Sequence, residues 1–199
     1  MTKIALFGTS ADPPTVGHQA ILSWLSQHYD WVAAWASDNP LKEGQTPLPH
    51  RATMLRLSIE DLNPPRHNIG LHQDISSRRT LETLEKAKAK WPGSEFTLVI
   101  GSDLVNQLPR WYRVEDLLRQ VQLLVVPRPG DPIEEVDLKR LKEMGGKIAI
   151  ASIVGLDISS TAYRENRNTI SLTPTVEAYI CREHLYSCQD ATPKRLHIR

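Results

Sequence analysis

A glycine and two hydroxyl residues stand near the front of the chain, directly after a short apolar run. The run ends at Phe7, and Gly8, Thr9 and Ser10 follow it. A glycine lets a phosphate group approach the backbone closely, and backbone N–H groups and hydroxyls can donate hydrogen bonds to it. The residue types and their order therefore indicate a site for a phosphate group.

A second set of residues suited to binding phosphate stands at the start of the helix that follows. The spacing of apolar residues predicts a helix over residues 16–28, with Thr15 just before it. The free N–H groups and the positive dipole end of that helix would favour an anion. Gly17 permits close approach of a ligand or of the sheet, and the His18 imidazole could stabilise charge that develops on a phosphoryl group. The same residues also suit a plain strand–turn–helix, in which Thr15 caps the helix and His18 packs or faces solvent.

Hydroxyl residues and an arginine recur near the other end of the chain. Ser159, Ser160 and Thr161 open a further predicted helix, and Arg164 follows one turn later. Together they offer N–H and O–H donors and a guanidinium to the phosphates of a nucleotide. The alternative is a simple helix start with a solvated arginine.

A carboxylate and two aromatic residues follow the most apolar strand, at residues 96–100. Asp103 could accept a hydrogen bond from a ribose hydroxyl, or it could cap the turn that follows it. Trp111 and Tyr112 could stack on a flat ring or could belong to the core.

Buried strands and amphipathic helices alternate along the chain and would position these residues. Strands are predicted at residues 4–7, 31–36, 69–71, 96–100, 123–126 and 148–150, and helices at 16–28, 54–62, 80–91, 138–144, 159–166 and 174–184, with a loop at 38–49. Apolar strands separated by helices predict an α/β fold, a Rossmann-like doubly wound parallel sheet. Ligands of such sheets bind beyond the carboxyl ends of the strands, where the strand order reverses.

Composition limits the classes to which the protein can belong. The 199 residues carry 24 Lys and Arg against 23 Asp and Glu, a net charge of +1, which argues against a nucleic-acid-binding surface. No stretch approaches the roughly 18 apolar residues that span a bilayer, so no membrane contact is expected. The two cysteines form neither a disulfide framework nor a zinc site, which favours a cytoplasmic protein. We expect one domain over residues 1–188 and a polar tail at 189–199; a homo-oligomer remains open.

Four short blocks, taken together, resemble one known family. Residues 15–18 resemble the (T/H)xGH motif of the nucleotidylyltransferase superfamily, and residues 7–18 are similar to bacterial nicotinate mononucleotide adenylyltransferases. The further blocks stand in that family's order, at residues 101–112 (GxD…FPxW), 126–130 (RPG) and 158–164 (ISSTxxR). The resemblance covers roughly residues 3–186 and implies the nucleotidylyltransferase form of the Rossmann-like sheet.

The resemblance also implies a reaction and a set of site residues. AMP would pass from ATP to nicotinate mononucleotide, giving nicotinate adenine dinucleotide and pyrophosphate in NAD biosynthesis, with His18 and Arg164 as catalytic residues. The ATP-binding residues would be Gly8, Thr9, Ser10, Thr15, Gly17, His18, Gly101, Asp103, Ile158, Ser159, Ser160, Thr161 and Arg164. The mononucleotide-binding residues would be Asn39, Lys42, Thr80, Trp111 and Tyr112. Mg²⁺ would arrive on the ATP phosphates, without a metal site built from protein ligands.

The chain departs from the family pattern mainly in the acceptor half. Thr15 stands where the family usually has histidine, Ala11 and Arg79 replace aromatic residues, and Leu41 replaces a histidine. The acceptor could therefore also be nicotinamide mononucleotide or pantetheine phosphate. A non-catalytic nucleotide-binding protein is the remaining alternative.

Overall fold

The computed structural model describes residues 1–38, 42–153, 158–166 and 171–187. Within them, six strands form one sheet in the order β3-β2-β1-β4-β5-β6, and every neighbouring pair is parallel. The strands are β1 (Lys3–Thr9), β2 (Trp31–Ala36), β3 (Ile69–Leu71), β4 (Glu95–Gly101), β5 (Gln122–Val126) and β6 (Lys147–Ile150). This is the strand order of the Rossmann fold. From β1 the chain first adds strands on one side and then, starting with β4, on the other, so the strand order reverses between β1 and β4. The predicted fold class is confirmed.

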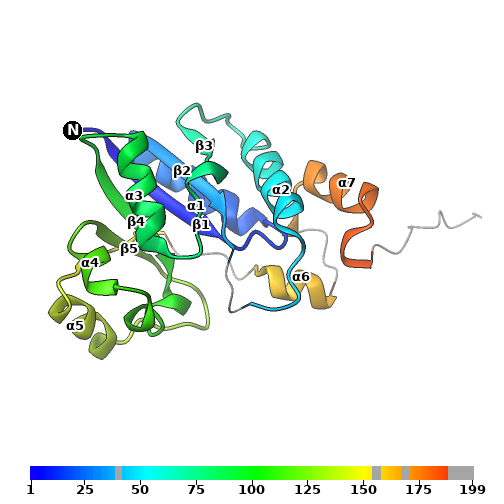
Figure 1. Ribbon diagram of the computed structural model, residues 1–199. Helices are drawn as coiled ribbons and strands as arrows, with labels where there is room; N and C mark the ends of the chain where they lie inside the picture. Colours follow the sequence, from blue (N-terminus) through cyan, green and yellow to red (C-terminus); the bar gives the residue numbers. More distant parts are fainter. Residues whose placement is uncertain (39–41, 154–157, 167–170, 188–199) are drawn as a thin grey trace, which may run out of the picture.

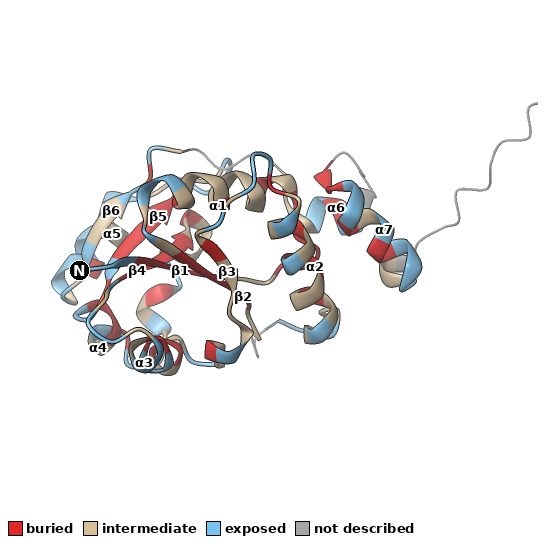
Figure 2. Cartoon of the chain, turned by 90° about the horizontal axis from the view of Figure 1, so that it is seen from above, coloured by how far each residue is buried: buried red, intermediate tan, exposed pale blue. Residues whose placement is uncertain are grey.

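Helices connect the strands and cover both faces of the sheet. They are α1 (Val16–His28), α2 (Leu48–Glu60), α3 (Thr80–Lys90), α4 (Val114–Leu118), α5 (Glu135–Glu143), α6 (Ser160–Asn166) and α7 (Pro174–Arg182). Leu22 and Leu25 of α1 and Leu55 of α2 pack on one face. On the opposite face lie α3 and α4, which Figure 2 shows across the sheet from α1. Each fully buried leucine contributes roughly 1.5–3 kcal/mol to the stability of this arrangement.

A third apolar cluster holds the last two helices beside the sheet rather than on it. Met54 of α2 packs there with Tyr163 of α6 and with Val176 and Ile180 of α7. Figure 1 shows α7 (orange) on the far side of α2 from the strands and α6 (gold) below α2. The cluster thereby brings α6 to the edge of the sheet at which β1 and β2 end. Among the described helices, none has the length and apolar character needed to cross a membrane.

The structure corrects several predicted boundaries; β1 continues to Thr9, beyond the predicted end at 7, and α7 ends at Arg182, two residues before its predicted end. Helix α2 begins at Leu48, inside the segment 38–49 that was predicted to be a loop. Pro49 lies in the first turn of this helix, where the missing N–H group would have no helical partner in any case. Helix α5 begins at Glu135, three residues before the predicted start. Asn39, and the tail predicted at 189–199, lie outside the described residues.

Candidate functional site

The loop after β1 lies at the point where the strand order reverses. Gly8 and Thr9 end the strand and Ser10 begins the loop, all of them half-buried. A Cβ atom at Gly8 would overlap the indole ring of Trp35 on the neighbouring strand, so the packing of this ring across Gly8 requires glycine there. The loop therefore carries small residues and hydroxyls, as the phosphate hypothesis requires.

The His18 imidazole is held on both of its nitrogens. The Thr15 backbone N–H can only donate, and its nitrogen lies 3.0 Å from Nδ1, so Nδ1 accepts this hydrogen bond. In the neutral ring the proton then sits on Nε2, which lies 3.0 Å from Thr9 Oγ1. The Thr15 side chain is only 1% exposed, and its hydroxyl lies 3.0 Å from Nδ1. Thr15 thus orients the ring so that its N–H donor is directed toward the end of β1.

Two effects keep this imidazole neutral. Burial, and to a smaller extent the charge of Arg128, lowers the pKa of His18 from 6.5 to about 4. The uncharged ring is therefore the resting form at neutral pH, and it acts as a hydrogen-bond donor through Nε2.

This pKa predicts how the stability of the protein depends on pH. The folded-state pKa lies below that of the unfolded chain, so His18 binds a proton more readily when unfolded. The neutral His18 therefore contributes fully to the free energy of unfolding above pH 6.5, and this contribution is lost as the pH falls from 6.5 to about 4. Relative to His18→Gln, the free energy of unfolding should fall by about 1 kcal/mol between pH 7 and pH 5.5. Urea titrations of both proteins measure this difference; a difference that does not change with pH would contradict the assigned proton state.

The C-terminal block docks directly on the loop after β1. The Ser160 hydroxyl donates to the Pro13 carbonyl at 2.8 Å, and Arg164 Nη1 donates to the Asp12 carbonyl at 2.6 Å. These contacts join segments that are 147 and 152 residues apart in the chain. Arg164 Nη2 also donates to Thr161 Oγ1 at 3.2 Å. The two halves of the predicted nucleotide site therefore meet at one place.

Local hydrogen bonds fix the start of α6. Ser159 Oγ accepts a hydrogen bond from the Ala162 N–H at 3.0 Å, which caps the first turn. Ile158 and Ser159 are half-buried beside it, whereas Thr161 is exposed. The predicted helix start is confirmed, with Ser159 just before the first helical residue.

A buried carboxylate lies under this junction and was not among the predicted site residues. Asp12 is 3% exposed and accepts hydrogen bonds from the Tyr186 hydroxyl at 2.6 Å and from the Thr46 N–H at 3.3 Å. Burial and the contact with Asp12 raise the pKa of Tyr186, so the phenol keeps its proton and donates it. Asp12 thereby ties the loop after β1 to residues near the end of the described chain.

The loops after β4 and β5 add a cation beside the site. Arg128 Nη1 lies 3.0 Å from Asp103 Oδ1, and the Arg128 N–H donates to Ser102 Oγ at 2.9 Å. A Cβ atom at Gly101 would overlap both the Asp103 carboxylate and the Arg128 side chain, so glycine is required for this packing. Because the charge of Arg128 lowers the pKa of His18, the arginine lies within electrostatic reach of the imidazole.

An open cleft of about 210 Å³ adjoins this ion pair. Its lining residues are Ser102, Asp103, Val105, Asn106, Asp131, Pro132, Glu134 and Asp137. Four carboxylates line this cleft, which disfavours phosphate groups and suits hydroxyls that can donate to them. The cleft is thus compatible with a sugar next to Asp103 and less so with a triphosphate.

The predicted mononucleotide residues are found in two places. Lys42 lies on the loop after β2 and donates from Nζ to Ser10 Oγ at 3.1 Å, which joins it to the loop after β1. Thr80 is the first residue of α3, and the preceding Arg79 places its guanidinium 4.1 Å from the centre of the Tyr112 ring. Tyr112 is 48% exposed, while Trp111 is half-buried against the core below α3 and α4. An accessible aromatic ring and the Arg79 cation, which also pairs with Glu82 at 3.5 Å, therefore lie beside the start of α3.

Comparisons with known proteins identify the family of this chain. Residues 6–166 match the model of the cytidylyltransferase-like family. A relative from Synechocystis, described as a probable nicotinate-nucleotide adenylyltransferase, is 42% identical over 92% of this chain and 98% of its own length. The nicotinate-nucleotide adenylyltransferase of Bacillus subtilis is 26% identical over 94% of this chain and 99% of its own length.

A solved structure has the same fold. The nicotinic acid mononucleotide adenylyltransferase of Plasmodium falciparum, complexed with NaAD, superposes with a TM-score of 0.82 at 23% identity, covering 95% of this chain and 99% of that one. With the family match over most of the chain and the relative at 42% identity, the chain belongs to the cytidylyltransferase-like family, in the group of the nicotinate-nucleotide adenylyltransferases.

Proposed function

We propose that the protein transfers the adenylyl group of ATP to nicotinate mononucleotide, producing nicotinate adenine dinucleotide and pyrophosphate for NAD biosynthesis. The observation that carries the proposal is the junction of the two blocks predicted to bind phosphate, where Ser160 and Arg164 bond to the loop that precedes His18. A phosphate oxygen of the mononucleotide attacks the α-phosphorus of ATP in line. The new P–O bond forms as the bond to the β-phosphate bridging oxygen breaks, and pyrophosphate leaves with the electron pair.

Positioning and charge stabilisation supply the catalysis, without a covalent enzyme intermediate. The His18 Nε2–H donates to the phosphoryl oxygens as charge develops there, and the Arg164 guanidinium neutralises charge on the departing phosphates. Gly8, Thr9, Ser10 and Gly17 line the phosphate path, and Thr15 acts by holding the His18 ring. Gly101 and Asp103 take the ribose, and the segment from Ile158 to Thr161 closes the nucleotide site.

The acceptor lies against the loops after β2, β3 and β4. Lys42 approaches the mononucleotide phosphate, and Trp111 and Tyr112 offer ring surface to the pyridine. Backbone N–H groups near Thr80 and Tyr112 recognise the nicotinate carboxylate. The exposed Tyr112 ring beside the Arg79 cation supports this placement, since a positive charge there favours an anionic acceptor.

Magnesium would enter the site bound to the phosphates of ATP. Over the described residues, no three His, Cys, Asp or Glu side chains gather as a metal site. Mg²⁺ retains waters and substrate oxygens readily, so the phosphates of ATP would supply most of its ligands. The ion would neutralise charge on the phosphates during transfer. We expect the enzyme to act in the cytoplasm.

The acceptor preference tests the substrate assignment. We expect kcat/KM for nicotinate mononucleotide to exceed that for nicotinamide mononucleotide at least tenfold, because only the nicotinate presents a carboxylate to the N–H donors and to Arg79. A ratio below ten would contradict the nicotinate assignment. Pyrophosphate release measured with each mononucleotide and with pantetheine phosphate gives the ratio and identifies a different acceptor if there is one. ATP binding without pyrophosphate release from any acceptor would instead indicate a non-catalytic nucleotide-binding protein.

A further inference from the structure

One buried arginine bonds to both of the loops that border the proposed reaction site. Arg51 lies in the first turn of α2 and is 2% exposed. Its Nη1 donates to the Ser10 carbonyl at 2.9 Å and to the Ser37 carbonyl at 2.7 Å. Its Nε donates to the Thr46 carbonyl at 2.7 Å. A single guanidinium thus holds the loop after β1, the loop after β2 and the segment that leads into α2.

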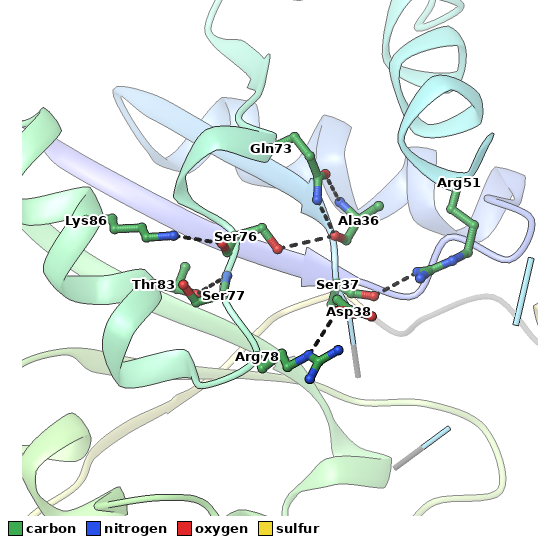
Figure 3. Close-up of polar contacts among 10 residues, drawn as sticks. All are labelled: Ala36, Ser37, Asp38, Arg51, Gln73, Ser76, Ser77, Arg78, Thr83 and Lys86. Carbon is green, nitrogen blue, oxygen red and sulfur yellow. Dashed lines mark hydrogen bonds and ion pairs between the residues drawn. The ribbon is translucent and has the colours of Figure 1, made fainter. Parts of the chain in front are cut away.

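The end of β2, from which this loop starts, is held by a second side chain. The Gln73 side chain donates to the Ala36 carbonyl at 2.8 Å and accepts from the Ala36 N–H at 3.0 Å. Figure 3 shows Gln73 and Arg51 approaching the end of β2 from opposite sides. These bonds of Gln73 are to the last residue of β2, whereas Arg51 joins Ser37 in the following loop to Ser10. Arg51 therefore fixes the position of one loop relative to the other.

Charges around Arg51 favour its ionised form. Burial lowers the pKa of its guanidinium, and the carboxylates of Asp12 and Asp38 offset part of that effect. Asp38 is itself paired with Arg78 at 3.3 Å between its Oδ2 and the arginine Nε. An arginine keeps its proton even when buried, so the donors of Arg51 remain available over the working pH range.

We infer that Arg51 is a positioning residue for adenylyl transfer, setting the separation between the loop that holds the ATP phosphates and the loop that holds the acceptor. The inference rests on the proposed function. In-line attack requires the acceptor oxygen about 3–3.5 Å from the α-phosphorus, and a misplacement of about 1 Å costs roughly a hundredfold in rate. The planar fork of arginine reaches carbonyls in several directions, whereas a lysine ammonium is a point charge on a flexible stem. The exposed bond from Lys42 to Ser10 is a weaker second bridge between the same loops.

Binding and turnover of Arg51→Lys and Arg51→Ala test the inference. Dissociation constants are measured by calorimetry for α,β-methylene ATP and, separately, for nicotinate mononucleotide, and kcat is measured with ATP and the mononucleotide. For folded Arg51→Lys we expect both dissociation constants to rise at least fivefold and kcat to fall at least tenfold. Arg51→Ala should show larger changes of the same kind; if it does not fold, Arg51→Lys carries the test.

Leu55→Ala is the matched control for a loss of stability. Leu55 lies one turn further along α2, is fully buried against the sheet and belongs to the apolar cluster there. Assayed well below its melting temperature, this variant should keep both dissociation constants and kcat within threefold of wild type. The inference is overturned if folded Arg51→Lys also stays within threefold, or if Leu55→Ala reproduces its changes. Failure of the wild type to form any dinucleotide would overturn the proposed function instead. The dissociation constants would still test whether Arg51 positions the two loops.

Discussion

Replacing His18 by alanine is expected to lower kcat by about 10²–10³, the loss typical of one preorganised transition-state donor. The structure fixes the ring through Nδ1 and leaves the proton on Nε2, directed at the end of β1. Because the pKa of about 4 keeps the ring neutral, the donor strengthens its bond as charge develops on the phosphoryl oxygens. The KM for ATP should change much less, since the donor acts mainly in the transition state. Steady-state kinetics with saturating mononucleotide measure both constants.

His28→Ala is the control within the same helix. His28 lies in the last turn of α1, is exposed, and has its Nδ1 2.8 Å from the Trp24 carbonyl oxygen. Its loss removes a histidine from α1 without touching the loop after β1, so kcat should stay within twofold of wild type. Activity of His18→Ala within threefold of wild type would remove His18 from the mechanism.

Replacing Arg164 by alanine is expected to lower kcat/KM for ATP by about 10²–10³. The substitution removes a cation from the departing phosphates, and it also removes the bond that holds α6 against the Asp12 carbonyl. Arg164→Lys keeps the charge and loses the planar fork that bonds to the Asp12 carbonyl and to Thr161, so it should recover part of the rate but remain at least tenfold below wild type. The split between kcat and KM separates charge stabilisation from loss of binding, as only the first lowers kcat.

Arg56→Ala controls for the loss of one positive charge. Arg56 lies on the exposed side of α2 and pairs with Glu60 one turn later, at 2.7 Å. An exposed pair of this kind contributes at most about 1 kcal/mol to stability, and we expect no change in kcat/KM beyond twofold. If Arg164→Ala behaves like Arg56→Ala, the guanidinium has no part in catalysis.

Local patterns were sufficient to predict the architecture. The strands at 31–36 and 69–71 appear with the predicted limits, and so does α1, since continuous apolar runs and helical spacing report burial directly. Parallel strands bring their carboxyl ends to one edge. The segments that follow β1, β2 and β4, with His18, Lys42 and Asp103, could therefore be placed together from sequence. That the Ser160 block belongs to the same site as the loop after β1 could be expected only from the resemblance of both motifs to one family, because the periodicity of the sequence does not indicate it.

The supporting residues were not predictable from single positions. Arg51 lies between the predicted loop at 38–49 and the predicted helix at 54–62, and nothing in the spacing shows that its side chain turns inward to three carbonyls. Tyr186 reaches Asp12 across 174 residues, and such a pairing depends on how α7 packs against α2. The pKa of His18 is equally hidden, because it depends on burial and on Arg128 from a distant strand end. These features follow from tertiary packing, which a local pattern does not encode.

The most direct test of the account is the product that the purified protein makes from ATP, Mg²⁺ and nicotinate mononucleotide. We expect nicotinate adenine dinucleotide and pyrophosphate in a ratio of one to one, followed by mass spectrometry and a coupled pyrophosphate assay. Absence of the dinucleotide while ATP still binds, or pyrophosphate release that does not depend on the mononucleotide, would contradict the proposed adenylyl transfer.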